Sequence, residues 1–314
     1  MKKKLVAGAV TLLSVVTLAA CANGTNKDVV TMKGDTITVS DFYDEIKTNQ
    51  GAQQVLFQMT INKVFEKEYG SKVSDKEVDK ELAKQKKQLG NRFDAYLAQQ
   101  GLTEETAKKQ IRSNMLLEYA VSQAAKKDIK ESDYKAAFES YTPEVTAQII
   151  KLDSEDKAKE VLEAAKAEGA DFAQIAKDNS TDTATKDKGG EVKFDSGTAD
   201  IPSQVKEAAF KLDENGISDV ITVSAGQNYS ASYYIVKLNK KTEKGSDWKK
   251  YEKRLKEIIV DGRKQDTNYI RSIIAKAMTN ANIKVKDDAF KSTFNQYLQN
   301  IGVQTSDSKS SSKK

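Results

Sequence analysis

Histidine is absent from all 314 residues of the sequence, and this absence excludes more chemistry than any other feature. The commonest general acid–base side chain and the commonest metal ligand are both missing. The chain has one cysteine, which excludes an intrachain disulfide and, without histidine, a zinc site of the usual kind. No glycine-rich phosphate loop is present. The sequence therefore predicts no metal site and no cofactor.

Prolines are also few, and the net charge is small for a chain of this length. Only two prolines interrupt the chain while 31% of its residues are charged, a composition that favours a soluble, helix-rich protein. The length suggests about two domains. Lys2, Lys3 and Lys4 belong to the 51 basic residues, and the remaining 48 nearly balance the 46 acidic ones. Because no cluster of basic and aromatic residues follows, we expect no nucleic-acid partner.

The apolar run at the N-terminus, residues 5–20, is too short for a membrane-spanning helix, which needs about 20 residues. It follows three lysines and ends in small residues, so residues 1–20 are predicted to be a secretory signal peptide, with an uncleaved anchor as the alternative. Cys21 ends the string "LAAC", which resembles a bacterial lipobox. The resemblance implies that Cys21 carries lipid; a free thiol is the alternative. Residues 21–28 would form a polar tether to the membrane.

Apolar residues recur at helical spacing through the N-terminal part of the chain, over residues 40–141. We therefore expect residues 29–142 to form a helical arm that starts with a small hairpin. Ser40 is predicted to cap the first helix, and Ser74 to Glu77 reads "SDKE", a capping box that opens a later one.

Strand patterns are confined to the middle of the chain, residues 143–240, where the predicted order is βααβαββ. A second helical arm is expected over residues 241–303, with a helical pattern from 248 to about 281. The tail, residues 304–314, is low in complexity and predicted to be disordered. The simplest organisation is one helical domain built from both arms, with the middle domain inserted into it.

The middle region carries a series of strings in a fixed order. They are "TAQIIKL", "GADFAQIAKDNSTD", "KGGEV", "EAAFKL", "ISDVI" and "YYIVKL". In this order they resemble a parvulin-type peptidyl-prolyl isomerase domain. With the lipobox and the helical arms, essentially the whole mature chain resembles the PrsA foldase lipoproteins of Gram-positive bacteria. The N-terminal arm is similar to the chaperone region of SurA-like proteins. The resemblance implies an α+β fold: a helical chaperone domain formed by the N- and C-terminal arms, with an inserted parvulin-like domain.

The resemblance also identifies catalytic positions, and two of them depart from the family pattern. Parvulins usually have histidines in strings like "ASHIL" and "YHII", where this chain has Gln148 and Tyr234. Asp182 matches the acidic residue after the second helix. Glutamine and tyrosine can still donate and accept hydrogen bonds, so they replace the histidines in one interpretation. In the other, which we favour, Gln148 and Tyr234 fill the strand interior as satisfied polar groups.

The proline pocket departs from the family pattern as well. Val205 stands where parvulins have a phenylalanine, and no methionine precedes "AAF". Phe194 and Phe210 remain as aromatic candidates for the pocket. We therefore expect an isomerase domain whose activity is weak or lost.

The predicted function is that of an extracytoplasmic foldase or chaperone. Its partners would be unfolded or newly secreted client proteins. The lipid on Cys21 would hold the foldase itself on the outer face of the cell membrane. Two alternatives remain at this stage: a substrate-binding lipoprotein of a transporter, and a surface adhesin. The helical arms argue against the first, because such lipoproteins have two lobes of alternating strands and helices.

Overall fold

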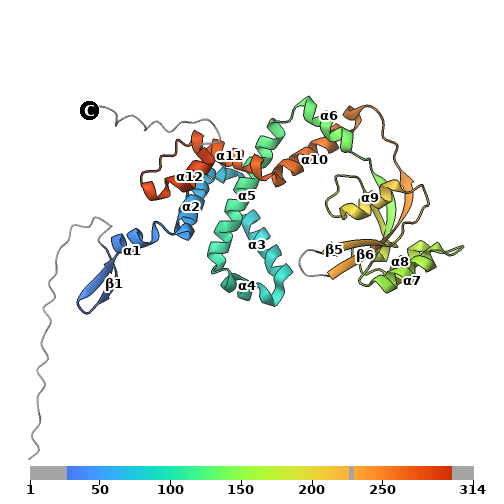
Figure 1. Ribbon diagram of the computed structural model, residues 1–314, viewed down its shortest axis with the longest axis horizontal. Coiled ribbons are helices and arrows are strands. Elements are labelled where there is room, and N and C mark those ends of the chain that lie inside the picture. The colour runs from blue at the N-terminus through green and yellow to red at the C-terminus, as the bar shows by residue number, and fades with distance from the viewer. Residues whose placement is uncertain (1–26, 226–229, 299–314) are drawn as a thin grey trace, which may run out of the picture. The chain divides into compact units, whose positions relative to one another are not determined.

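A computed structural model describes residues 27–225 and 230–298 of the chain (Figure 1). The predicted signal peptide at 1–20, the lipidation site Cys21 and the tail at 304–314 lie outside the described residues. The contacts divide the chain into two compact units. The first unit takes residues up to Ser113 and from Ile274 onward, and the second takes the residues between them. No helix in the described parts is long and apolar enough to cross a membrane.

The first unit combines both ends of the chain. Its strands β1 and β2 form an antiparallel hairpin, and helices follow. The elements are β1 (Asp28–Met32), β2 (Asp35–Thr38), α1 (Val39–Ile46), α2 (Gln50–Tyr69), α3 (Asp75–Leu89), α4 (Phe93–Gln99), the start of α5 (Glu104–Lys127), the end of α11 (Thr267–Asn280) and α12 (Lys291–Leu298). Phe57 of α2 packs against Phe294 and Tyr297 of α12, with ring centroids 5.5 and 4.3 Å apart. Aromatic stacking thus joins the two ends.

Helix caps in the first unit follow local sequence, with one correction. The capping box at α3 is confirmed: the Glu77 N–H donates to Ser74 Oγ at 3.3 Å, and the Ser74 N–H donates to Glu77 Oε2 at 2.7 Å. The prediction that Ser40 caps α1 is wrong. Thr38 is the cap, and Asp41 completes its box, so the helix begins two residues earlier. Thr38 and Ser40 are both residue types that cap helices. Strand β2 ends at Thr38, and α1 starts at the next residue.

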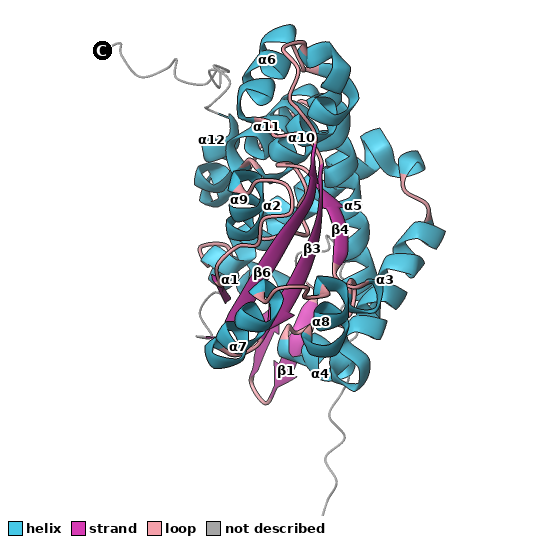
Figure 2. Cartoon of the chain, turned by 90° about the vertical axis from the view of Figure 1, so that its right-hand side faces the viewer, coloured by secondary structure: helices cyan, strands magenta, loops and turns pink. Residues whose placement is uncertain are grey.

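The second unit contains a four-stranded antiparallel sheet in the order β4-β3-β6-β5 (Figure 2). The elements are the rest of α5, α6 (Glu131–Ser140), β3 (Val145–Leu152), α7 (Glu155–Lys166), α8 (Phe172–Asn179), β4 (Glu191–Phe194), α9 (Ser203–Lys211), β5 (Ile221–Ala225), β6 (Ser230–Lys241), α10 (Glu252–Gln265) and the start of α11. From β3 to β6 the order is βααβαββ, so the predicted fold class is confirmed.

Each face of this sheet carries its own core, because successive residues of a strand point to opposite faces. Val145, Ala147 and Ile149 of β3 lie on the face covered by α9. Ile150 and Leu152 lie on the other face, packed against α7 and α8. A strand buried on both faces reads as a nearly continuous apolar run, which "VTAQIIKL" does.

The C-terminal arm contains a break that the sequence did not predict. The helical pattern expected from 248 to about 281 forms two helices, α10 and α11, which are separated at Asp266. Asp266 adopts an extended backbone, with φ −77° and ψ 106°. Its Oδ1 accepts hydrogen bonds from the N–H groups of Asn268 at 2.8 Å and Tyr269 at 3.2 Å, so it acts as the cap of α11. No glycine or proline marks this break.

Candidate functional site

Tyr234, one of the predicted catalytic positions, lies on strand β6 between Lys151 of β3 and Ile221 of β5. Directly opposed residues of paired strands share a face, so its side chain lies on the α9 face with the apolar core there. Burial is the main cause that raises the pKa of Tyr234, and the negative charge of Asp182 adds to it.

Gln148 lies on the opposite face of the sheet. It is three residues from Lys151 on the same strand, and it pairs with Lys237 of β6 rather than with Tyr234. Its Nε2 donates to the backbone oxygen of Gly189 at 3.0 Å. The structure thus separates Gln148 from Tyr234, and the glutamine holds the loop that precedes β4.

Asp182 stabilises its own loop. Its Oδ1 accepts from the N–H of Ala184 at 3.1 Å, and its Oδ2 accepts from the Thr185 hydroxyl at 2.6 Å. The same loop ends in Gly189 and Gly190, whose φ angles are +68° and +79°. These bonds define Asp182 as a loop cap, which is the structural role that aspartate commonly has in turns.

The residues assigned to the proline pocket are mostly core residues. Val205 and Phe194 are 0% and 1% exposed, so neither offers surface to a prolyl ring. Phe210 is half-buried and packs against Phe194 with ring centroids 5.8 Å apart. On the α9 face, only Phe210 and Tyr234 of the predicted site residues keep part of their surface exposed.

The first unit holds an apolar groove that the sequence did not identify. It encloses about 720 Å³. The lining residues are Tyr43, Ile46, Ala52, Val55, Leu56, Met59, Thr60, the segment 282–287, Phe290 and Phe294. Val55 and Met59 of α2 are 59% and 51% exposed, which is high for apolar side chains on a helix. A groove of this size and lining is typical of a site that binds apolar side chains.

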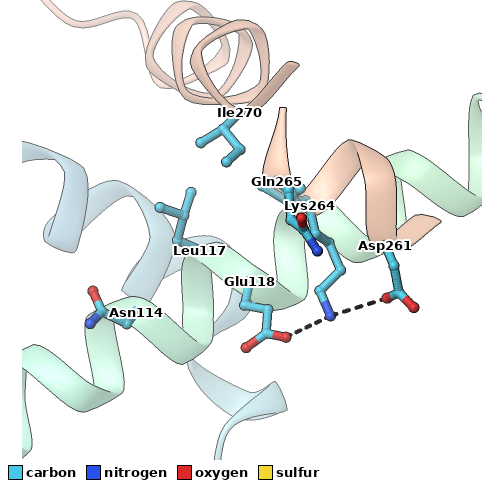
Figure 3. Close-up of a pocket in the computed structure, with 8 residues that line it drawn as sticks. Asn114, Leu117, Glu118, Asp261, Lys264, Gln265 and Ile270 are labelled. Atoms are coloured by element: carbon cyan, nitrogen blue, oxygen red, sulfur yellow. Dashed lines mark ion pairs between the residues drawn. The ribbon is translucent and has the colours of Figure 1, made fainter. Parts of the chain in front are cut away.

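A smaller cavity of about 360 Å³ lies in the second unit, between α5, α10 and α11 (Figure 3). Leu117 and Ile270 supply apolar surface. Lys264 reaches across its rim to Glu118 at 2.8 Å and to Asp261 at 3.7 Å. The hydrogen bond with Glu118 is the main cause that raises the pKa of Lys264. This lysine is already paired, so the cavity offers little to an additional charged ligand.

The class of the second unit's sheet region follows from comparison with known families. A family model described as "PPIC-type PPIASE domain" matches residues 140–240. The match contains the β3-to-β6 sheet except Lys241, the last residue of β6. The second unit therefore includes a domain of the parvulin type, with the βααβαββ order described above.

The whole chain is similar to foldases. It is 62% identical to "Foldase protein PrsA" of Streptococcus sanguinis, over 96% of this chain and 90% of that protein. It is 60% identical to the protein of the same name in Streptococcus gordonii, over 100% of both chains. A crystal structure of the Streptococcus pneumoniae foldase matches with 55% identity and a TM-score of 0.77, covering 86% of this chain and 99% of that one. The chain belongs to the PrsA foldase family.

Proposed function

We propose that this protein is an extracytoplasmic foldase that binds unfolded, newly secreted proteins and assists their folding. Membership of the foldase family carries the proposal. The apolar groove of the first unit supports it, because Val55 and Met59 expose apolar surface that unfolded chains can bind without sequence specificity.

The experiment compares two clients, each with and without the protein. One client aggregates during refolding, and the other refolds at a rate limited by proline isomerisation. We expect suppressed aggregation of the first. If aggregation is unchanged at every ratio of foldase to client, the proposed function is wrong.

We further propose that the isomerase activity of the parvulin domain is weak or lost. Isomerisation requires an apolar pocket for the ring and hydrogen bonding that favours the twisted amide. Gln148 and Tyr234 lie on opposite faces of the sheet, and Val205 is buried. We expect little acceleration of the proline-limited client. A large acceleration that disappears in Tyr234→Phe or Asp182→Ala would overturn this proposal.

A lipid on Cys21 is the proposed membrane anchor, with the protein on the outer face of the membrane of a Gram-positive bacterium. The "LAAC" string supports it. Cys21→Ala should leave the precursor unprocessed or release the protein from membranes. A Cys21→Ala protein that is cleaved and retained like the natural one would contradict the anchor.

The domain boundaries are proposed as 29–142 and 241–303 for the helical arms and 143–240 for the inserted domain. Val145 and Lys241, near the two ends of the inserted region, are paired residues of neighbouring strands. Their closeness supports an insertion, because an inserted domain needs ends that lie side by side. The relatives reported above give no support to a transporter lipoprotein or to an adhesin.

A further inference from the structure

The segment that links α11 to α12 has the side-chain pattern of a β-strand, although it belongs to no sheet (Figure 1). Ile283, Val285 and Asp287 are half-buried, while Lys284 and Lys286 between them are exposed. This period of two is that of an extended chain. All five residues line the apolar groove of the first unit, and an extended segment of this length spans about 16 Å.

Both ends of this segment are fixed. The Ile283 N–H donates to the backbone oxygen of Met278 at 3.2 Å. At the other end, the Asp287 carboxylate accepts from the Tyr43 hydroxyl at 2.8 Å and from the Ala289 N–H at 2.9 Å. The segment is therefore held in place before any ligand arrives.

The middle of the segment has unused backbone groups. Among the described residues, the N–H and C=O groups of Lys284, Val285 and Lys286 have no hydrogen-bond partner. A strand edge with unpaired groups is a template on which another extended chain can add as a strand. The apolar groove lies beside this edge, and alternate side chains of an added strand would point toward it.

The charge of the edge selects the ligand further. Lys284 and Lys286 form no ion pair with any carboxylate in the described ranges, whereas Lys47 nearby is paired with Asp44 at 2.7 Å. Acidic side chains on an added strand would meet two available ammonium groups. The chain's own tail is a poor occupant, because residues 304–314 carry three lysines against one aspartate.

We propose that an extended segment of an unfolded client adds as a β-strand along residues 283–287. Its alternate apolar side chains enter the groove against Val55 and Met59, and its acidic side chains lie beside Lys284 and Lys286. This inference rests on the proposed foldase function and adds the conformation and the chemistry of the bound segment.

The test uses labelled peptides with the full chain, and binding is measured by fluorescence anisotropy. One peptide alternates valine and threonine and has glutamates at both ends; a second has lysines in place of the glutamates. We expect the acidic peptide to bind about fivefold more tightly, the size that two exposed ion pairs supply. Two further peptides carry N-methyl groups on alternate amides, on one strand edge or on the other. One of these should lose binding and the other should keep it, because strand addition uses one edge only.

Variants of the protein complete the test. Lys284→Glu with Lys286→Glu should reverse the preference between acidic and basic peptides. The matched control is Lys80→Glu with Lys87→Glu, two exposed lysines of α3 outside the groove, which should leave the preference unchanged. Met59→Ser should weaken all the peptides, and its exposed position keeps the fold intact.

The possible outcomes distinguish a failure of strand addition from a failure of the proposed foldase function. Equal binding of both N-methylated peptides, or a preference that ignores the Lys284 and Lys286 changes, would overturn strand addition even if client aggregation is suppressed. Unsuppressed aggregation by the natural protein would overturn the foldase function itself. If deleting residues 299–314 tightens peptide binding about tenfold or more, the tail is the occupant and the inference is wrong.

Discussion

Asp195 is the most constrained charged residue in the second unit. Its side chain is 7% exposed, and Arg254 of α10 binds it through two hydrogen bonds of 2.6 and 2.8 Å. The Tyr141 hydroxyl donates at 3.1 Å and the Thr198 hydroxyl at 2.9 Å. Burial alone would raise the pKa of Asp195, but the hydrogen bonds from Arg254 and Thr198 outweigh it and lower the pKa. One carboxylate thus connects the sheet domain to a helix of the C-terminal arm.

Asp195→Asn should destabilise the full chain by about 2 kcal/mol at neutral pH, because the half-buried Arg254 would lose its buried partner and keep only the more exposed Glu257, at 3.1 Å. A carboxylate whose pKa is lowered by folding stabilises the fold at pH values above its unfolded pKa of about 3.9. This stabilisation is lost as the pH falls through the pKa of the folded state. The difference between the two proteins should therefore shrink below about pH 4. Urea unfolding at several pH values measures it. Asp219→Asn is the matched control, because its pair with Lys166 is exposed and should contribute little.

Gly190 is a position where only glycine fits. Its φ is +79°, and a Cβ there would lie 2.5 Å from the carbonyl oxygen of Ile149 in strand β3. Gly190→Ala should cost about 3 kcal/mol or more, because backbone must move on both sides. Gly262→Ala in α10 is the control: a Cβ there meets nothing within 4 Å, so alanine should stabilise the helix by up to about 1 kcal/mol. Equal stability of the two variants in thermal unfolding would contradict this account.

At the scale of elements, sequence predicted what local pattern controls. The capping box at Ser74 and the order of strands and helices were predicted, because caps and apolar periods are written in neighbouring residues. The break at Asp266 was missed, since an aspartate inside a helical pattern looks like any exposed polar residue. The separation of Gln148 from Tyr234 was also out of reach, because the register of β3 against β6 decides the faces.

The inserted domain should fold without its arms. Both cores of the sheet are formed by residues between Val145 and Leu238, and the sheet itself ends at Lys241, so residues 141–241 alone should unfold cooperatively. Asp195→Asn should change the stability of this fragment much less than that of the full chain, because Arg254 is absent and water reaches the carboxylate. Circular dichroism and urea unfolding of this fragment, with Asp195 and with Asn at that position, test the prediction. A fragment without near-ultraviolet signal or a cooperative transition would show that the helical arm is required.

At the scale of the whole molecule, sequence predicted the family and the parvulin domain but not the groove. The groove combines α1 and α2 with residues 282–287, more than 200 positions later in the chain. Val55 and Met59 read as ordinary members of an apolar pattern, and only the packing of the two arms shows that they stay exposed. A surface assembled from distant segments has no local signal.

The last prediction is that the helical arms bind clients without the inserted domain. Val145 and Lys241 are cross-strand partners, and such Cα atoms lie about 4.5–5.5 Å apart. A short glycine-serine linker can therefore join residues 27–142 to 241–298 without strain. The joined protein keeps the groove, because every residue that lines it belongs to the arms.

We expect the joined protein to be helical and to retain most of the suppression of client aggregation, while the fragment 141–241 retains little. Val55→Glu with Met59→Glu in the joined protein should then remove the suppression, and these exposed positions tolerate the charge. If the fragment suppresses aggregation as well as the full chain and the joined protein does not, clients bind the parvulin domain instead.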